Sequence, residues 1–269
     1  MSRHKILFFS AVLLLASAAA ADGLCGRETA PGPVFDHGAV VRADPTRKQI
    51  ALVFTGHEFA DGGDWIAAVL KKNNVPAGFF FTGDFYRAPD KAPLIERLRR
   101  DGHYLGPHSD KHLLYCSWQN RDTLLVTKDE FVSDILRNYD AMKSFGVDRA
   151  QASWFIPPFE WYNETIAAWA KEMGLTLFNF SPGTASNADY TTPDLPNYRS
   201  SADIFRSIFA CERSDPHGLK GFILLLHIGT HPDREDKFYF RLDDLVTGLN
   251  NRGYAFVRID RLLGRNKEP

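Results

Sequence analysis

The sequence predicts an α/β fold, specifically a barrel of about seven mostly parallel strands related to the TIM barrel. Short apolar runs alternate with longer amphipathic stretches along the 269 residues, which is the pattern of repeated strand and helix units. The apolar runs are rich in Val, Ile, Leu and Phe without polar alternation, as is typical of strands covered on both faces. A doubly wound open sheet is the alternative, but the first strand is not followed by G-x-G-x-x-G and no P-loop occurs.

Seven apolar runs are expected to form the strands, and six amphipathic stretches the helices. The strands are predicted at QIALVF (49–54), AGFFFT (77–82), HYLGP (103–107), WFIPP (154–158), LTLFNF (175–180), GFILLLH (221–227) and YAFVRI (254–259). Helices are predicted near 63–73, 90–101, 128–145, 163–173, 200–212 and 240–252. Thr127, followed by Lys-Asp-Glu, predicts a capping box at the start of the third helix.

The first 21 residues have the pattern of a secretory signal peptide. Arg3 and Lys5 precede an apolar run from Ile6 to Leu15, and small alanines follow at a suitable cleavage site. The apolar run is too short to span a bilayer as a retained helix. We therefore expect a signal peptide over 1–21, export to the periplasm or the extracellular space, and no stable membrane insertion.

The remaining chain is expected to form an arm and one catalytic domain. Residues 22–47 contain several prolines and read as an extended N-terminal arm that packs across the barrel. Residues 48–265 carry the strand and helix pattern and are expected to form the barrel. No second domain and no internal repeat are indicated.

Composition and cysteine spacing exclude several classes of protein. The chain is 44% hydrophobic and 24% charged, which is ordinary for a globular domain. With 32 basic and 33 acidic residues it lacks the electrostatic footprint of a nucleic-acid partner. The cysteines, Cys25, Cys116 and Cys211, form no C-x-x-C pair, which argues against a thiolate zinc site. One disulfide with one remaining thiol, or three unpaired cysteines, are both open.

Polar residues gather where the predicted strands end. The runs are followed or closed by TGHEFADGG, TGDFY, HSDKH, PPFEWYN and HIGTHPD. In a parallel barrel these ends open on one face, which is where active sites lie. Five histidines are therefore expected to converge there: His57, His108, His112, His227 and His231.

A metal ion explains two of these histidines. His108 and His112 are four residues apart, and at the start of a helix this spacing would direct both imidazoles to one point. Imidazole suits Zn²⁺, Co²⁺ and Ni²⁺. Glu58 and His57 are candidates for the third ligand, which would leave an open position for a catalytic water. His227, at the end of FILLLH, is placed to protonate a leaving group.

Several motifs in this order resemble the polysaccharide deacetylase family, carbohydrate esterase family four. HSDKH (108–112) matches its H-S-x-x-H motif, IPPF (156–159) its R-x-P-x-[YF] motif in the prolines and the aromatic residue, and LLLH (224–227) its L-x-H motif. The resemblance covers about residues 48–260. It implies a distorted (β/α)7 barrel and a secreted, metal-dependent hydrolase, with Zn²⁺ the expected ion, that removes acetyl groups from a polysaccharide or oligosaccharide. It also implies a proton-transfer role for His227.

The departures from the family pattern mark a divergent branch. Where the family has two aspartates, a base and then a metal ligand, this chain has Thr55 and Gly56, with His57 and Glu58 following. We assign His57 as the base and Glu58 as the ligand, although the opposite assignment is chemically sound. Ile156 replaces the arginine of the third motif. Substrate contacts are predicted at Pro158, Phe159, Glu160, Trp161 and Tyr162, with Glu160 where the family has glycine.

Two other functions are compatible with the sequence. Glu58 and Glu160 both follow strands and could serve as the carboxylate pair of a glycoside hydrolase. Alternatively, the chain is a carbohydrate-binding homologue that lost activity with the family aspartates. The polar loop 186–201 either covers the site or only connects two elements.

Overall fold

Four parallel strands form the centre of the molecule. The computed structural model describes residues 32–264, so the predicted signal peptide lies outside the described residues. The strands adjoin in the order β5 (Tyr104–Pro107), β4 (Gly78–Phe81), β3 (Gln49–Gly56) and β8 (Ile223–His227). β9 (Ala255–Phe256) pairs with the beginning of β3. Because the register places Thr55 opposite Phe80 and His227, these strands end at one level.

The rest of the barrel wall is interrupted. β6 (Trp154–Phe155) and β7 (Thr176–Leu177) form a separate parallel pair, and β1 (Val34–Asp36) and β2 (Ala39–Arg42) form an antiparallel hairpin. Val40 bridges Phe178, and the N–H of Ser181 donates to the carbonyl of Ile223 at 3.0 Å, which connects this part back to β8. Each of the seven predicted runs contains a strand, and the prediction of a distorted α/β barrel is confirmed.

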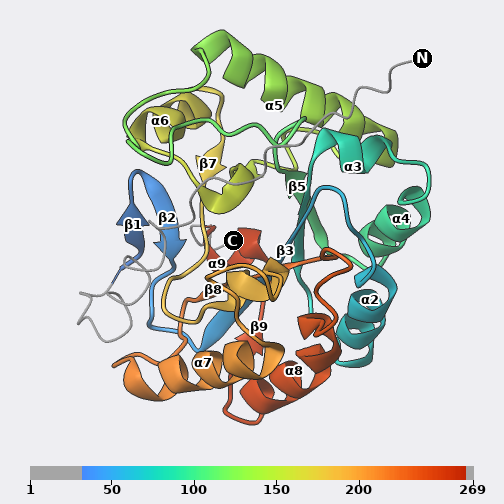
Figure 1. Cartoon of the computed structure of the whole chain (residues 1–269), viewed down its shortest axis with the longest axis vertical. Helices are drawn as coiled ribbons and strands as arrows, with labels where there is room; N and C mark the ends of the chain where they lie inside the picture. Colours follow the sequence, from blue (N-terminus) through green and yellow to red (C-terminus); the bar gives the residue numbers. More distant parts are fainter. Residues whose placement is uncertain (1–31, 265–269) are drawn as a thin grey trace, which may run out of the picture.

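Helices surround the strands on the outside (Figure 1). They are α2 (Gly63–Lys72), α3 (Gly83–Arg87), α4 (Ala92–Arg100), α5 (Lys128–Met142), α6 (Glu164–Glu172), α7 (Ser201–Ser214), α8 (Leu242–Asn250) and α9 (Ile259–Leu262). The predicted capping box at Thr127 is present at the start of α5. The short helix α3 was not predicted; the hydroxyl of Thr82 caps it by accepting from the N–H of Phe85. Short 3₁₀ segments are η1 (Lys143–Phe145), η2 (Pro158–Glu160), η3 (Ser186–Tyr190) and η4 (Phe238–Arg241).

Aromatic residues of the central strands fill the core. Phe54 and Phe79 stack with ring centroids 5.0 Å apart, and both side chains are fully buried. Burial of one such side chain stabilises a fold by about 1.5–3 kcal/mol. Cys116 is a buried free thiol, whereas Cys211 is disulfide-bonded, so the alternative of three unpaired cysteines is wrong. In residues 32–264, no helix has both the length and the apolar character needed to cross a bilayer.

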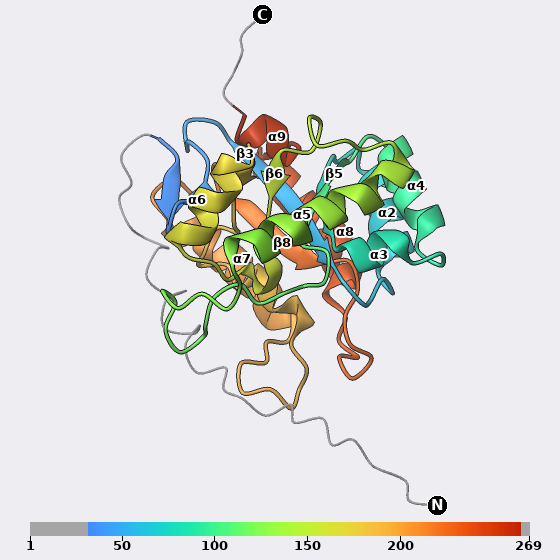
Figure 2. The ribbon, with the colours of Figure 1, turned by 90° about the horizontal axis from the view of Figure 1, so that it is seen from above.

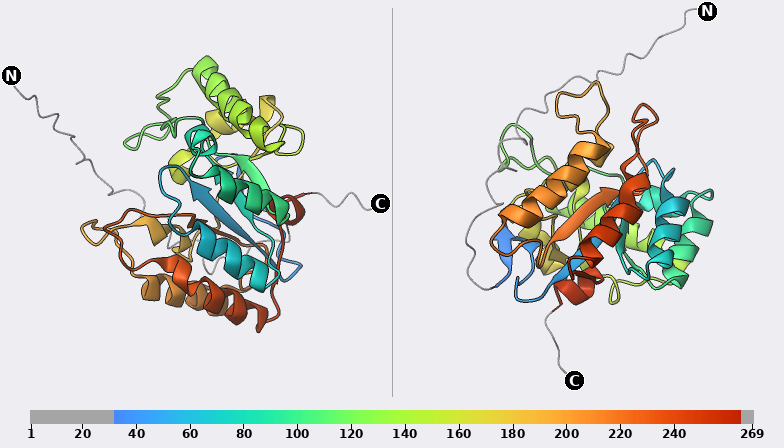
Figure 3. Two further views of the ribbon diagram at one scale, coloured as in Figure 1. Left: turned by 90° about the vertical axis from the view of Figure 1, so that its right-hand side faces the viewer. Right: turned by 90° about the horizontal axis from the view of Figure 1, so that it is seen from below.

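The long loops project from one side of the barrel. In Figure 2 the gold segment that follows η3 and the orange segment between β8 and η4 extend in the same direction. Figure 3 shows the two segments side by side from another direction. Since the parallel strands end on this side, the loops surround the mouth where the predicted site residues were expected.

Candidate active site

One cavity brings the five predicted histidines together. It has a volume of about 470 Å³, and its lining includes His57, His108, His112, His227 and His231. Glu58 and Glu160 also line it. Much of the remaining wall is aromatic, from Phe59, Trp118, Phe159, Trp161 and Tyr190. The convergence follows from the parallel register, because the histidines follow or end neighbouring strands.

His108 and His112 lie in a loop after β5, not at the start of a helix. The helical expectation for residues 108–112 is therefore wrong. Ser109 and His112 instead adopt left-handed backbone conformations, with φ of 72° and 55°. The resulting turn still brings the two imidazole rings together, with centroids 5.1 Å apart and planes at 64°.

Buried polar residues of α5 hold this loop in place. Asn138 Oδ1 accepts from the N–H of His108 at 2.8 Å. Asp134 Oδ1 accepts from the N–H of Asp110 at 3.2 Å, and its Oδ2 accepts from the hydroxyl of Tyr115 at 2.7 Å. The sequence analysis missed Asp134 and Asn138. Their one sequence signal is that polar residues four apart occupy the buried face of an amphipathic helix.

The environment keeps His108 and His112 neutral. Nδ1 of His108 donates to the carbonyl of Ile156 at 2.9 Å, which leaves the lone pair on Nε2. Burial lowers the pKa of His108 to about 3, even though the hydrogen bond to Ile156 opposes the shift. Burial, followed by the neighbouring imidazoles of His108 and His57, lowers the pKa of His112 to about 2. A neutral imidazole with one nitrogen fixed by a carbonyl is the form that binds metals.

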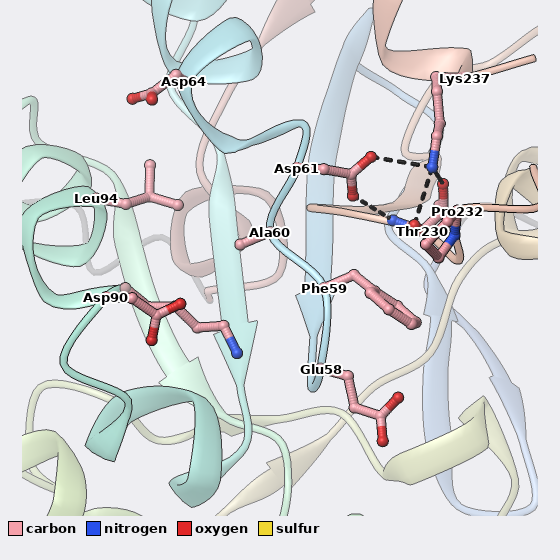
Figure 4. Close-up of a pocket in the computed structure, with 11 residues that line it drawn as sticks. Glu58, Phe59, Ala60, Asp61, Asp64, Asp90, Leu94, Thr230, Pro232 and Lys237 are labelled. Atoms are coloured by element: carbon pink, nitrogen blue, oxygen red, sulfur yellow. Dashed lines mark hydrogen bonds and ion pairs between the residues drawn. The ribbon is translucent and has the colours of Figure 1, made fainter. Parts of the chain in front are cut away.

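His57 packs against His112, whereas Glu58 is exposed. The His57 ring lies 4.8 Å from the His112 ring between centroids, nearly parallel to it, and its Nδ1 is 3.1 Å from Thr82 Oγ1. Burial lowers the pKa of His57, partly offset by the charge of Glu58. Glu58 is exposed on the loop that follows β3. Its side chain also borders an adjoining cavity of about 590 Å³, which Figure 4 shows.

The donor atoms of these residues suit a divalent ion in type. His108 has a free Nε2, and His57 and His112 are its ring neighbours. Within residues 32–264, however, no group of three or more His, Cys, Asp or Glu side chains has the arrangement needed to hold a metal ion. The three imidazoles are thus suitable ligands by atom type. Their rings would have to move closer together to hold an ion.

His227 is paired with Asp189, which the sequence analysis missed. Nδ1 of His227 donates to Asp189 Oδ1 at 2.6 Å, and the N–H of His227 donates to Asp189 Oδ2 at 2.9 Å. Burial lowers the pKa of His227, but the charge and hydrogen bond of Asp189 outweigh it, so the pKa is raised. Asp189 belongs to η3 in the loop 186–201, so this loop contributes to the site.

Glu160 extends into the same cavity from an unusual backbone. Phe159 and Glu160 are both left-handed, with φ of 59° and 54°. The carbonyl of Glu160 accepts from Asn179 Nδ2 at 2.9 Å, which fixes the peptide. Burial raises the pKa of the Glu160 carboxyl to about 7, because the attraction of His227 offsets only part of it.

The two positions that carry aspartates in the resembling family differ in the room they leave for a side chain. Thr55 is buried and lines the cavity. At Gly56, an added Cβ would meet the side chains of Ile228, Phe81 and Phe85. Position 56 therefore excludes a carboxylate side chain in this packing.

Asp61 joins the loop after β3 to the loop after β8. Its Oδ1 accepts from the N–H of Thr230 at 2.8 Å, and its Oδ2 lies 3.0 Å from Lys237 Nζ and 2.9 Å from the Tyr239 hydroxyl. Figure 4 shows the contacts of the Asp61 carboxylate with both Thr230 and Lys237, with Glu58 apart from them. Asp61 thus holds the segment that follows His227.

The five predicted substrate residues separate into two groups. Phe159, Glu160 and Trp161 line the cavity, and the Phe159 ring lies 4.3 Å from that of His112. Pro158 and Tyr162 are buried and do not line it. The Tyr162 hydroxyl donates to the carbonyl of Asp36, so this residue packs against the N-terminal hairpin.

The sequence model of the polysaccharide deacetylase family matches residues 42–178, about half of the chain. The chain belongs to this family. Among curated proteins, the peptidoglycan-N-acetylglucosamine deacetylase PgdA of Listeria monocytogenes is 26% identical over 219 residues, which cover 81% of this chain and 40% of PgdA. The chain thus spans less than half the length of that polysaccharide deacetylase.

Solved structures show the same fold. The peptidoglycan N-acetylglucosamine deacetylase Bc1960 superimposes with a TM-score of 0.66 at 20% identity, over 85% of this chain and 94% of that chain. BA3943 of Bacillus anthracis, described as a pseudoenzyme of carbohydrate esterase family four, superimposes with a TM-score of 0.63 at 17% identity, over 85% of this chain and 69% of that chain. One of these two similar structures is thus described as a deacetylase and the other as a pseudoenzyme.

Proposed function

We propose that this protein is an exported, metal-dependent hydrolase that removes acetyl groups from a polysaccharide or oligosaccharide. The observation that carries the proposal is the cavity in which His108 and His112 lie beside an Asp189–His227 pair. Membership of the family supports deacetylation as the reaction class. Residues 48–265 would form the catalytic unit, with residues 1–21 directing export.

His108 and His112 are proposed as two ligands of a divalent ion, with Zn²⁺ expected and Co²⁺ or Ni²⁺ as alternatives. Family members generally depend on a divalent metal. For the third ligand the contacts favour His57 over Glu58, because the His57 ring adjoins His112 whereas Glu58 is exposed. This reverses the preference drawn from the sequence. When bound, such an ion polarises an acyl carbonyl and activates water.

The chain's own residues have separate parts in this proposal. His227, protonated and held by Asp189, donates a proton to the departing amine or alkoxide. Phe159 and Trp118 form an aromatic wall beside the histidines, with ring centroids 5.9 Å apart, against which a sugar ring can pack. Phe159 is 43% exposed, so its ring is available to a ligand.

The test is acetate release from acetylated chitooligosaccharides, peptidoglycan and acetylxylan by the metal-loaded protein. We expect acetate release on at least one substrate, dependence on the added ion, and no new reducing ends. New reducing ends without acetate would indicate the glycoside hydrolase alternative instead. Absence of acetate release on all three, with one equivalent of ion bound, would overturn the proposed activity.

A second candidate function is carbohydrate binding without catalysis. It is favoured by Thr55 and Gly56, which replace both family aspartates. This candidate predicts binding of chitooligosaccharides by calorimetry with no acetate release. Binding with turnover would exclude it.

A further inference from the structure

The reaction proposed above needs a group that accepts a proton from the attacking water, and the usual position for it is empty. In the resembling family the first aspartate after the strand is the base, and the corresponding residue here is Thr55. A threonine hydroxyl does not serve as a base near neutral pH. Gly56 has no side chain and no room for one. The base must come from another part of the cavity wall.

Few ionisable side chains that line the cavity are free for this task. His108, His112 and His57 are assigned to the ion, and His227 is committed to Asp189 through Nδ1 and to the leaving group. Glu58 and His231 are exposed on loops at the rim. Glu160 is half-buried, and its carboxylate is electrostatically coupled to His227 and Asp189.

The backbone conformation at Glu160 is a second, independent indication that this residue has a functional role. Residues other than glycine, asparagine and aspartate rarely adopt positive φ, and a left-handed conformation at a larger residue stores strain that is found mainly at functional sites. Here two such residues are adjacent, Phe159 at 59° and Glu160 at 54°. The hydrogen bond from Asn179 Nδ2 to the Glu160 carbonyl holds the second one. Glycine would fit position 160 without strain, so the carboxylate is retained at the expense of stability.

We propose that Glu160 is the general base of this enzyme, taking over the role of the aspartate that Thr55 replaces. The inference rests on the proposed deacetylase activity. The Glu160 carboxylate takes a proton from water as the water oxygen bonds to the acetyl carbon. As the bond from that carbon to the amine nitrogen or alkoxide oxygen breaks, His227 gives its Nε2 proton to the leaving group. Glu160 then returns its proton to His227, the acetic acid that has formed loses its proton to solvent, and acetate and the free amine or alcohol leave.

Two variants of Glu160 and one control test the proposal. Glu160→Gln keeps the shape and removes the basicity, and Glu160→Gly also removes the backbone strain. Asn74→Gly, at an exposed left-handed residue with φ of 52° between α2 and β4, is the control for a glycine substitution at such a position. The readouts are kcat for acetate release, metal content and Tm.

We expect both Glu160 variants to lose about 10²- to 10⁴-fold in kcat while binding the ion as the wild type does. Glu160→Gly should also raise Tm by about 2–4 °C, whereas Asn74→Gly keeps full kcat. If the wild type is active and the kcat of both Glu160 variants is within threefold of the wild-type value, the role of Glu160 is overturned and the proposed deacetylase function is not. Loss of the ion would make Glu160 a ligand, and a lower Tm for Glu160→Gly would make it structural; either overturns the proposal. An inactive wild type would overturn the proposed function, and the inference with it.

Discussion

Asp189 binds both the imidazole and the backbone of His227, through hydrogen bonds of 2.6 Å to Nδ1 and 2.9 Å from the N–H. The carboxylate raises the pKa of His227 against the effect of burial. A general acid must be protonated when the substrate is bound, so activity falls as pH rises through its pKa. If His227 is the general acid, as proposed, the interaction with Asp189 extends activity to higher pH.

Asp189→Asn should shift the alkaline limb of the kcat profile to lower pH and reduce kcat. The amide keeps an acceptor for the N–H of His227 but removes the charge that favours the imidazolium. Acetate release between pH 6 and pH 10 is the measurement. Asp194→Asn, an exposed carboxylate in the same loop, is the matched control and should leave the limb in place. An unshifted limb in Asp189→Asn would mean that His227 is not the group that titrates.

Substitutions of the proposed metal ligands should reduce metal binding, whereas substitution of Glu58 should not. His108→Ala, His112→Ala and His57→Ala should each lower bound Zn²⁺ well below one ion per chain and abolish the increase in Tm on adding the ion. Glu58→Gln should keep both. Elemental analysis and thermal scans with and without the ion measure this. The reverse result for His57 and Glu58 would restore the assignment drawn from the sequence, and full occupancy in both His108→Ala and His112→Ala would exclude a metal site here.

Asp61 should stabilise the fold more than its surface position suggests. In Asp61→Ala the N–H of Thr230, the hydroxyl of Tyr239 and the ammonium of Lys237 lose their shared acceptor. We expect a loss of about 1 kcal/mol in the free energy of unfolding, because Asp61 is 38% exposed and water partly replaces it. Urea unfolding measures this loss. Asp64→Ala, at a carboxylate that is 92% exposed, is the control and should change stability less. Equal losses would show that Asp61 does not hold the loop.

Stability should fall in mild acid because of His103. Its Nδ1 accepts from the N–H of Ala77 at 3.2 Å, and burial lowers its pKa to about 4. The unfolded chain therefore binds the proton more tightly, so the stability due to neutral His103 is complete above pH 6.5 and is lost as pH falls toward 4. Between pH 7.5 and pH 5 this amounts to about 2 kcal/mol. In urea unfolding at both pH values, His103→Asn should lose correspondingly less than the wild type; equal losses would contradict the prediction.

The residues that end strands could be predicted from the sequence because the strand pattern fixes their level. His57, His108 and His227 each follow or end a buried parallel strand, and the shared register brings them to one mouth. The apolar runs were long enough to identify each strand, although β6 and β7 shorten to two residues each. Functional side chains at strand ends can therefore be predicted from the sequence.

Residues fixed by tertiary contacts could not be predicted in the same way. Asp189 lies in a loop without periodicity, whose position depends on buried Arg234 donating to the carbonyls of Thr191 and Arg199. The spacing of His108 and His112 indicated a helix, but two left-handed residues produce the same convergence in a loop. The periodicity of hydrophobic residues indicates neither the position of such a loop nor the left-handed backbone conformation of single residues.

The crowding at Gly56 makes the difference from the two-aspartate pattern hard to reverse. A Cβ there would lie 2.7 Å from Ile228 Cγ2, 2.9 Å from Phe81 Cδ1 and 3.0 Å from Phe85 Cε2. These neighbours come from the β8 loop, β4 and α3, so an aspartate could enter only after three separate elements had been repacked. A variant in which these neighbours had been replaced by smaller side chains, but which still had Gly56, would have a cavity in the core, and such a cavity destabilises the fold. The packing around Gly56 therefore opposes a return to aspartate at this position, and any donor side chain of the proposed site has to come from elsewhere in the chain.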